Sequence, residues 1–166
     1  VIDVVVDDLA FLAVDAVIRP ADEWLAPVTT ASSRLDQQAG PRFADQRRVA
    51  SPLDLGAAVV TGGGDLTAQF VLHVVIQSAE QSTDLATIRR ALASAWHRAM
   101  EWRLTRVASP LIGAGPGRLG PEEAAELLAG SVPEPDESGF QPQLTIVLER
   151  EEDREMVEAA VRGRPR

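Results

Sequence analysis

Short apolar runs rich in β-branched residues alternate along this chain with longer amphipathic stretches. An unbroken apolar run of strand length is typical of a buried strand, whereas apolar residues at i, i+3 and i+4 are typical of a helix. The predicted strands are residues 2–6, 14–18, 57–61, 70–76, 106–112 and 144–148, and the predicted helices are 32–39, 84–103, 121–130 and 151–161. This alternation predicts an α/β fold with a largely parallel sheet that is covered by helices on both faces.

Two local features refine this prediction. Pro20 is expected to end the second strand, because proline cannot donate to a ladder of strand hydrogen bonds. The polar segment 42–55 shows no clear periodicity and is expected to be irregular.

Polar or glycine-rich segments follow several of the predicted strands. They are Asp7-Asp8, Arg19 to Asp22, Gly62 to Gly64 and Gly113 to Gly117. In open α/β sheets, ligands bind at the carboxyl ends of the strands. Glycines at such a turn allow positive φ and can direct backbone N–H groups towards an anion, although a tight strand-to-helix turn explains the same glycines. The sequence therefore predicts that any ligand site lies along this edge of the sheet.

The composition excludes several kinds of chemistry. The chain carries 25 acidic and 16 basic side chains, a net charge of −9, and it has neither cysteine nor lysine. Phosphate contacts need clustered cations, so we expect no general nucleic-acid binding and no binding to anionic membranes. Without cysteine, and with two distant histidines, we expect no metal site, and nothing in the sequence indicates a cofactor.

The length of 166 residues predicts one domain, which we place at residues 1–162, with a frayed tail at 163–166. No apolar run approaches the ~20 residues of a membrane span. The first six residues lack the basic segment of a secretory signal, so a cytoplasmic location is expected.

At this point the order of segments resembles a bacterial macro domain over nearly all of residues 2–162. The resemblance is carried mainly by scaffold segments, namely residues 14–18, 56–66, 71–74 and 107–115. It implies a three-layer α/β/α sandwich with a mixed, largely parallel central sheet. It also implies ADP-ribose as the typical ligand, and many members of the family hydrolyse ADP-ribosyl linkages.

The resemblance transfers some ligand-binding roles to residues of this chain. In the family the first strand ends in Gly-Asp-Ile, where the Asp accepts from the adenine amino group; Asp8 and Leu9 match the Asp and Ile here. A carboxylate suits an exocyclic amine because it only accepts hydrogen bonds. The second phosphate loop of the family matches Gly113, Ala114, Gly115 and Gly117, while Pro116 lacks an N–H donor.

Other motifs depart from the family. Asp22 stands where the family has the last Asn of Asn-Ala-Ala-Asn, and Ser32 stands where the hydrolases have an Asp that helps to activate water. These two are the candidate catalytic residues, and Asp22 is also a candidate ligand contact. Residues 27–30, Pro-Val-Thr-Thr, replace consecutive glycines of the first phosphate loop. Proline and β-branched threonines cannot adopt the same positive-φ geometry cheaply, and each strained residue costs about 1–3 kcal/mol.

Two further side chains have alternative interpretations. Trp24 follows Asp22 and either stacks on a base or sugar or fills the cleft. His73 lies in an apolar strand, where a hydrogen-bonded core histidine is favoured over a catalytic one, and His97 is expected to face solvent.

The function that follows is a divergent macro-domain-like module that binds ADP-ribose or a related nucleotide or phosphate ligand, with weak or no hydrolase activity. One alternative is a degenerate macro fold with an altered ligand or a protein-interaction role. The other is an ADP-ribosyl hydrolase. An open groove above Gly113 and beside Asp8 would favour binding, whereas Trp24 or Arg19 filling that groove would favour the degenerate fold.

Overall fold

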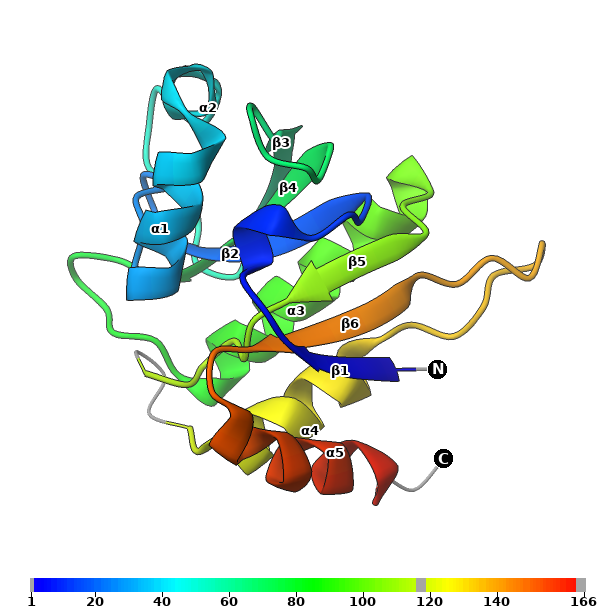
Figure 1. The fold of residues 1–166 in the computed structure, drawn as a ribbon. Coiled ribbons are helices and arrows are strands. Elements are labelled where there is room, and N and C mark those ends of the chain that lie inside the picture. The colour runs from blue at the N-terminus through cyan, green and yellow to red at the C-terminus, as the bar shows by residue number, and fades with distance from the viewer. Residues whose placement is uncertain (1, 116–118, 164–166) are drawn as a thin grey trace.

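The structure is a computed structural model that describes residues 2–115 and 119–163 (Figure 1). Its strands form one mixed sheet of six strands in the order β1-β6-β5-β2-β4-β3. All neighbouring strands are parallel except β3 and β4, which are antiparallel. The strands are β1 (Ile2–Val6), β2 (Ala16–Asp22), β3 (Ala58–Gly62), β4 (Phe70–Gln77), β5 (Arg106–Ser109) and β6 (Gln143–Leu148).

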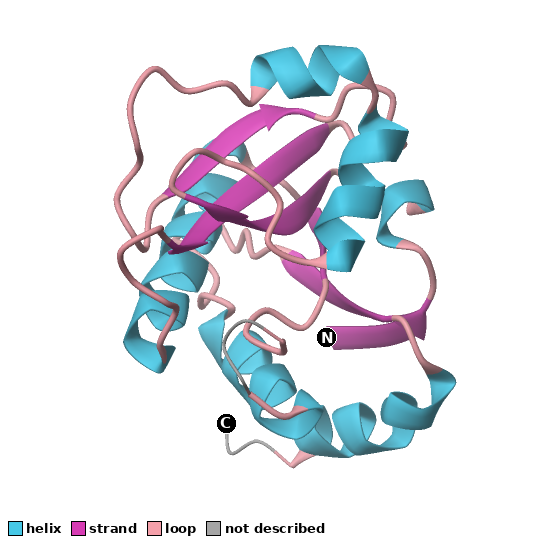
Figure 2. Ribbon diagram, turned by 90° about the vertical axis from the view of Figure 1, so that its left-hand side faces the viewer, coloured by secondary structure: helices cyan, strands magenta, loops and turns pink. Residues whose placement is uncertain are grey.

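Helices cover both faces of this sheet, which makes a three-layer α/β/α sandwich (Figure 2). Among the described residues the helices are α1 (Thr30–Ala39), α2 (Pro41–Gln46), α3 (Leu85–Trp102), α4 (Pro121–Ser131) and α5 (Arg154–Arg162), with short 3-10 turns η1 (Leu9–Phe11) and η2 (Glu151–Asp153). No helix in this part of the chain is both long and apolar enough to span a membrane. The α/β fold class predicted from the alternation of segments is confirmed.

The alternation of side chains along β2 divides the core into two apolar layers. Ala16 and Ile18 pack with α3, α4 and α5 on one face. Val17 belongs to the opposite layer, which includes Leu35 of α1 and Phe43 of α2. Successive strand residues point to opposite faces, so a strand buried on both sides reads as one continuous apolar run.

The second strand runs further than the sequence indicated, since Pro20 lies within β2 rather than after it. Pairing between β2 and β5 ends at Val17 and Ala108, whereas pairing between β2 and β4 continues past Pro20. Beyond Val17, β2 therefore borders a strand on one side alone, and proline is tolerated at such an edge.

The segment expected to be irregular contains the short helix α2, which begins with Pro41 at its first turn. Proline suits that position because the first N–H of a helix has no partner within it. Phe43 of α2 is fully buried, so one aromatic anchor fixes a helix that has no amphipathic repeat. The predicted tail lies outside the described residues apart from Gly163.

Candidate functional site

A cavity of about 910 Å³ opens at the carboxyl edge of the sheet. In Figure 1 the parallel strands β1, β5 and β6 run from right to left, so their carboxyl ends lie on the left. Residues 27–31 form one wall, at the start of α1, and residues 110–115 form the opposite wall, after β5. The end of β6 and the residues after it, 147–150, close a third side. The predicted edge of the sheet therefore does carry a cavity.

The first wall is a helix start rather than a glycine loop. Thr29 has extended backbone, φ −136°, and caps α1, since its Oγ1 accepts from the backbone N–H of Ser32 at 3.0 Å. The first N–H groups of a helix have no partner within it. Thr30 and Ala31, the first two residues of α1, both line the cavity. This wall therefore presents the start of a helix to the cavity, and none of residues 27–31 has positive φ.

The second wall depends on glycine. Gly113 has φ +98°, and a Cβ placed there would come within 2.8 Å of Leu119 Cδ1 and 2.9 Å of Ile88 Cδ1. Gly115 has φ +89° and faces open space. Together with Ala114, both glycines line the cavity, and their predicted contact with a phosphate remains a prediction. Gly117 lies outside the described residues.

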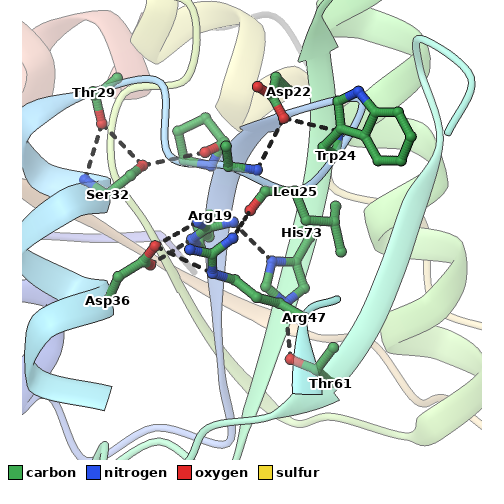
Figure 3. Close-up of polar contacts among 12 residues, drawn as sticks. Arg19, Asp22, Trp24, Leu25, Thr29, Ser32, Asp36, Arg47, Thr61 and His73 are labelled. Carbon is green, nitrogen blue, oxygen red and sulfur yellow. Dashed lines mark hydrogen bonds and ion pairs between the residues drawn. The ribbon is translucent and has the colours of Figure 1, made fainter. Parts of the chain in front are cut away.

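The candidate catalytic residues lie beside the first wall, and both are engaged in local hydrogen bonds (Figure 3). Asp22 Oδ1 accepts from the backbone N–H groups of Trp24 and Ala26, at 2.8 and 2.9 Å. The Ser32 hydroxyl is buried, accepts from the Thr29 hydroxyl at 2.9 Å and donates to the Pro20 carbonyl at 3.2 Å. Neither residue is among the described residues that line the cavity.

The predicted base-contacting residues lie outside the cavity as well. Asp8 caps η1, since its Oδ1 accepts from the Ala10 N–H at 3.0 Å. Asp8 and Leu9 are not among the described lining residues. Trp24 is 48% exposed and does not line the cavity either. Sequence reasoning alone cannot separate these roles, because an Asp that caps a turn and an Asp that contacts a ligand look alike.

A buried polar network lies between the sheet and α1 (Figure 3). The fully buried Arg19 of β2 donates to both carboxylate oxygens of Asp36 in α1, with Nε–Oδ1 at 2.7 Å and Nη2–Oδ2 at 2.6 Å. Its Nη1 lies 3.1 Å from His73 Nδ1, and His73 Nε2 lies 2.8 Å from Thr61 Oγ1. This bidentate pair fixes α1, and with it the cavity wall, to the central strands.

The network defines the protonation state of His73. Thr61 Oγ1 donates to the Gly62 carbonyl, so it accepts from His73 Nε2–H, and Nδ1 is left to accept from Arg19. Burial lowers the pKa of His73 well below its ordinary value, and the nearby positive charges of Arg19 and Arg47 lower it further. His73 is therefore a neutral, hydrogen-bonded core histidine. His97 is largely exposed.

We expect His73 to make the fold less stable in mild acid. The pKa of His73 is lower in the folded state than in the unfolded chain. Below about pH 6.5 the unfolded chain therefore binds a proton at this histidine, whereas the folded protein does not. Stability from this group is present above about pH 6.5 and is lost as the pH falls towards the folded pKa, by at most about 1.4 kcal/mol per pH unit. Urea unfolding between pH 7 and 5 measures it, with His73→Gln as the comparison. The loss should be steeper for the natural protein, and equal slopes would contradict the assignment.

Sequence reasoning missed the partnership of Arg19 and Asp36. The two residues lie 17 positions apart on different elements. One signal was available: an arginine inside an apolar strand must find an acidic partner if it is buried.

The fold and the cavity place this chain among α/β domains that carry their site at the carboxyl edge of the sheet. Residues 19–128 match the macro domain family. This match covers more than half of the chain, and the chain belongs to the macro domain family. The resemblance noted from the scaffold segments is thus confirmed.

Individual relatives agree with this assignment. An uncharacterized protein of Aeropyrum pernix is 30% identical over 75% of this chain and 67% of its own length. The mouse protein named ADP-ribose glycohydrolase MACROD1 is 30% identical over 76% of this chain and 40% of its own length. An uncharacterized protein of Mycobacterium tuberculosis is 27% identical over 75% of this chain and 35% of its length. The chain thus spans less than half the length of two of these three relatives.

Solved structures share the fold. The Oceanobacillus iheyensis macrodomain with ADP has a TM-score of 0.76 at 19% identity and covers 96% of this chain and 88% of its own. The Trypanosoma brucei macrodomain in complex with ADP-ribose has a TM-score of 0.80 at 17% identity and covers 96% of this chain and 68% of its own.

Proposed function

We propose that this macro domain binds ADP-ribose or a related nucleotide or phosphate ligand in the cavity at the carboxyl edge, with weak or no hydrolase activity. The observation that carries the proposal is the open space of about 910 Å³ between the start of α1 and Gly113 to Gly115. Amide groups at a helix start and in a glycine turn both favour anions. A diphosphate placed in this space would have a helix start on one side and a glycine turn on the other.

Two side chains that could have filled this space do not do so. Arg19 is buried against Asp36, and Trp24 is about half exposed and does not line the cavity. The cavity is open at Gly113, and this favours binding over a degenerate fold that serves only as a protein-interaction surface. Asp8, which was expected beside the same groove, does not line it. The macrodomains solved with ADP and with ADP-ribose support a ligand of the same kind here.

Weak or absent hydrolysis follows from the two candidate catalytic residues. One oxygen of Asp22 is committed to two backbone N–H groups, and Ser32 is buried and hydrogen-bonded. A general base must come within hydrogen-bond reach of the water that it activates. The alternative is hydrolysis, because the relative MACROD1 is named an ADP-ribose glycohydrolase. In that case the second carboxylate oxygen of Asp22 would activate the water.

Titration with ADP-ribose in a thermal-unfolding assay tests the proposed binding. Ligand at 100 times Kd should stabilise the folded protein by about 2.7 kcal/mol. No shift at millimolar ADP-ribose would contradict both binding and hydrolysis and would favour the degenerate fold.

Turnover of an ADP-ribosylated protein tests the second part of the proposal. We expect little or no release of ADP-ribose at enzyme concentrations that saturate binding. Rapid release that is abolished by Asp22→Ala would instead establish the hydrolase alternative.

A further inference from the structure

An ion pair connects α1 with the end of β6 beside the cavity. The guanidinium of Arg34, in α1, contacts the carboxylate of Glu149, which directly follows β6. The two residues are 115 positions apart, so the contact links segments that the sequence does not bring together. Both side chains are about half exposed, at 52% and 57%. Glu149 itself lines the cavity, as does Ser33, the neighbour of Arg34.

The pair stands where the cavity approaches the end of β1. The Asp7 N–H donates to the Leu148 carbonyl at 3.2 Å, so the turn that contains Asp8 adjoins the residue before Glu149. The 3-10 turn η1, which Asp8 caps, contacts α1. The cavity reaches Leu148, Glu149 and Ser33, but none of residues 7–9, all of them described, lines it.

We propose that the Arg34–Glu149 pair is a strap that closes the cavity towards the Asp8 turn and selects ligands by length. A ligand that occupies only the space between α1 and Gly113 to Gly115 binds with the strap closed. A ligand that extends to Asp8, as a nucleotide with a base would, must separate the two side chains. This inference rests on the proposed function and concerns the same site.

The strap is weak enough to open. Exposed ion pairs contribute little, because water screens the charges and both long side chains lose freedom when they pair. Their measured strength corresponds to roughly a two- to fivefold change in an equilibrium constant. Opening the strap therefore lowers the affinity for a long ligand by that factor and leaves a short ligand unaffected.

Calorimetric titration with ADP-ribose as the long ligand and ribose 5-phosphate as the short one tests the strap. The variants are Arg34→Gln and Glu149→Gln, with Glu158→Gln as the control, since Glu158 pairs with Arg162 on α5. We expect the ratio of ADP-ribose affinity to ribose 5-phosphate affinity to rise roughly two- to fivefold in both strap variants. The control should leave the ratio unchanged.

The two strap variants also separate a strap from simple electrostatics. If charge alone mattered, removing the negative Glu149 would strengthen binding of an anion and removing the positive Arg34 would weaken it. A strap predicts the same direction for both. The exchanged pair, Arg34→Glu with Glu149→Arg, should bring the ratio back to that of the natural protein.

The outcomes keep the strap distinct from the proposed function. If every protein binds both ligands with one unchanged ratio, or if the two strap variants move the ratio in opposite directions, the strap is overturned and the binding function stands. If the natural protein binds neither ligand but the strap variants bind ADP-ribose, the strap is overturned, because it predicts that the short ligand binds while the strap is closed. If no protein binds either ligand, both proposals are overturned.

Discussion

Replacing Asp36 by alanine is expected to lower the free energy of unfolding by about 3–5 kcal/mol. Asp36 is the bidentate partner of Arg19, whose guanidinium is fully buried. Burial lowers the pKa of Arg19, while the hydrogen bonds and charge of Asp36 raise it again. Without Asp36, Arg19 would keep a desolvated positive charge, and no carboxylate would accept the hydrogen bonds from its Nε and Nη2. The second basic neighbour of Asp36, Arg47, would add like charge to the same space.

Thermal unfolding measures this effect, and a decrease in Tm of roughly 6–20 °C is expected for a chain of this size. Asp45→Ala serves as the control, because Asp45 pairs with Arg48 on the surface and both side chains are mostly exposed. It should change stability by less than about 1 kcal/mol. The double variant Arg19→Met with Asp36→Leu should recover part of the loss, since apolar residues can replace a buried pair at low cost. A loss below 1 kcal/mol in Asp36→Ala would show that water or another group compensates Arg19.

The scaffold was predictable because its signals are local. Each buried strand reads as an apolar run, and α3 shows its buried stripe directly in the spacing of Ile88, Leu92 and Trp96. Glycines at positions 113 and 115 were predictable as a turn because their positive φ angles suit glycine. The order of these segments was enough to identify the fold class.

The lining of the site was less predictable because it depends on which side chains meet. Asp22 accepts from the backbone N–H groups of Trp24 and Ala26 in its own turn. No pattern in the sequence distinguishes this arrangement from one in which Asp22 faces a ligand. The partners Arg19 and Asp36, and likewise Arg34 and Glu149, come from distant segments. Pro20 lies within a strand because pairing with β5 ends before it, and that is a property of the whole sheet.

Placing an aspartate at position 31 is expected to weaken ADP-ribose binding at least tenfold without destabilising the fold. Ala31 lies in the first turn of α1 and lines the cavity. A carboxylate there would lie at the wall that offers amide donors. One unit charge about 5 Å from a phosphate charge is unfavourable by roughly 3 kcal/mol at an effective dielectric of 20, and salt reduces this. The same carboxylate complements the helix dipole, so the free protein should be unchanged or more stable by about 0.3–1 kcal/mol.

The opposite signs of these two effects make the test specific. Ala31→Asn has nearly the same shape without the charge, and Gln37→Glu adds the same charge on an exposed position of α1. Calorimetric titration and urea unfolding of the three variants give affinity and stability separately. Loss of binding in Ala31→Asp alone would locate the negatively charged part of the ligand at the start of α1. Equal affinities for Ala31→Asp and Ala31→Asn would mean that no anion binds there, and the ligand would have to lie nearer Gly113 to Gly115.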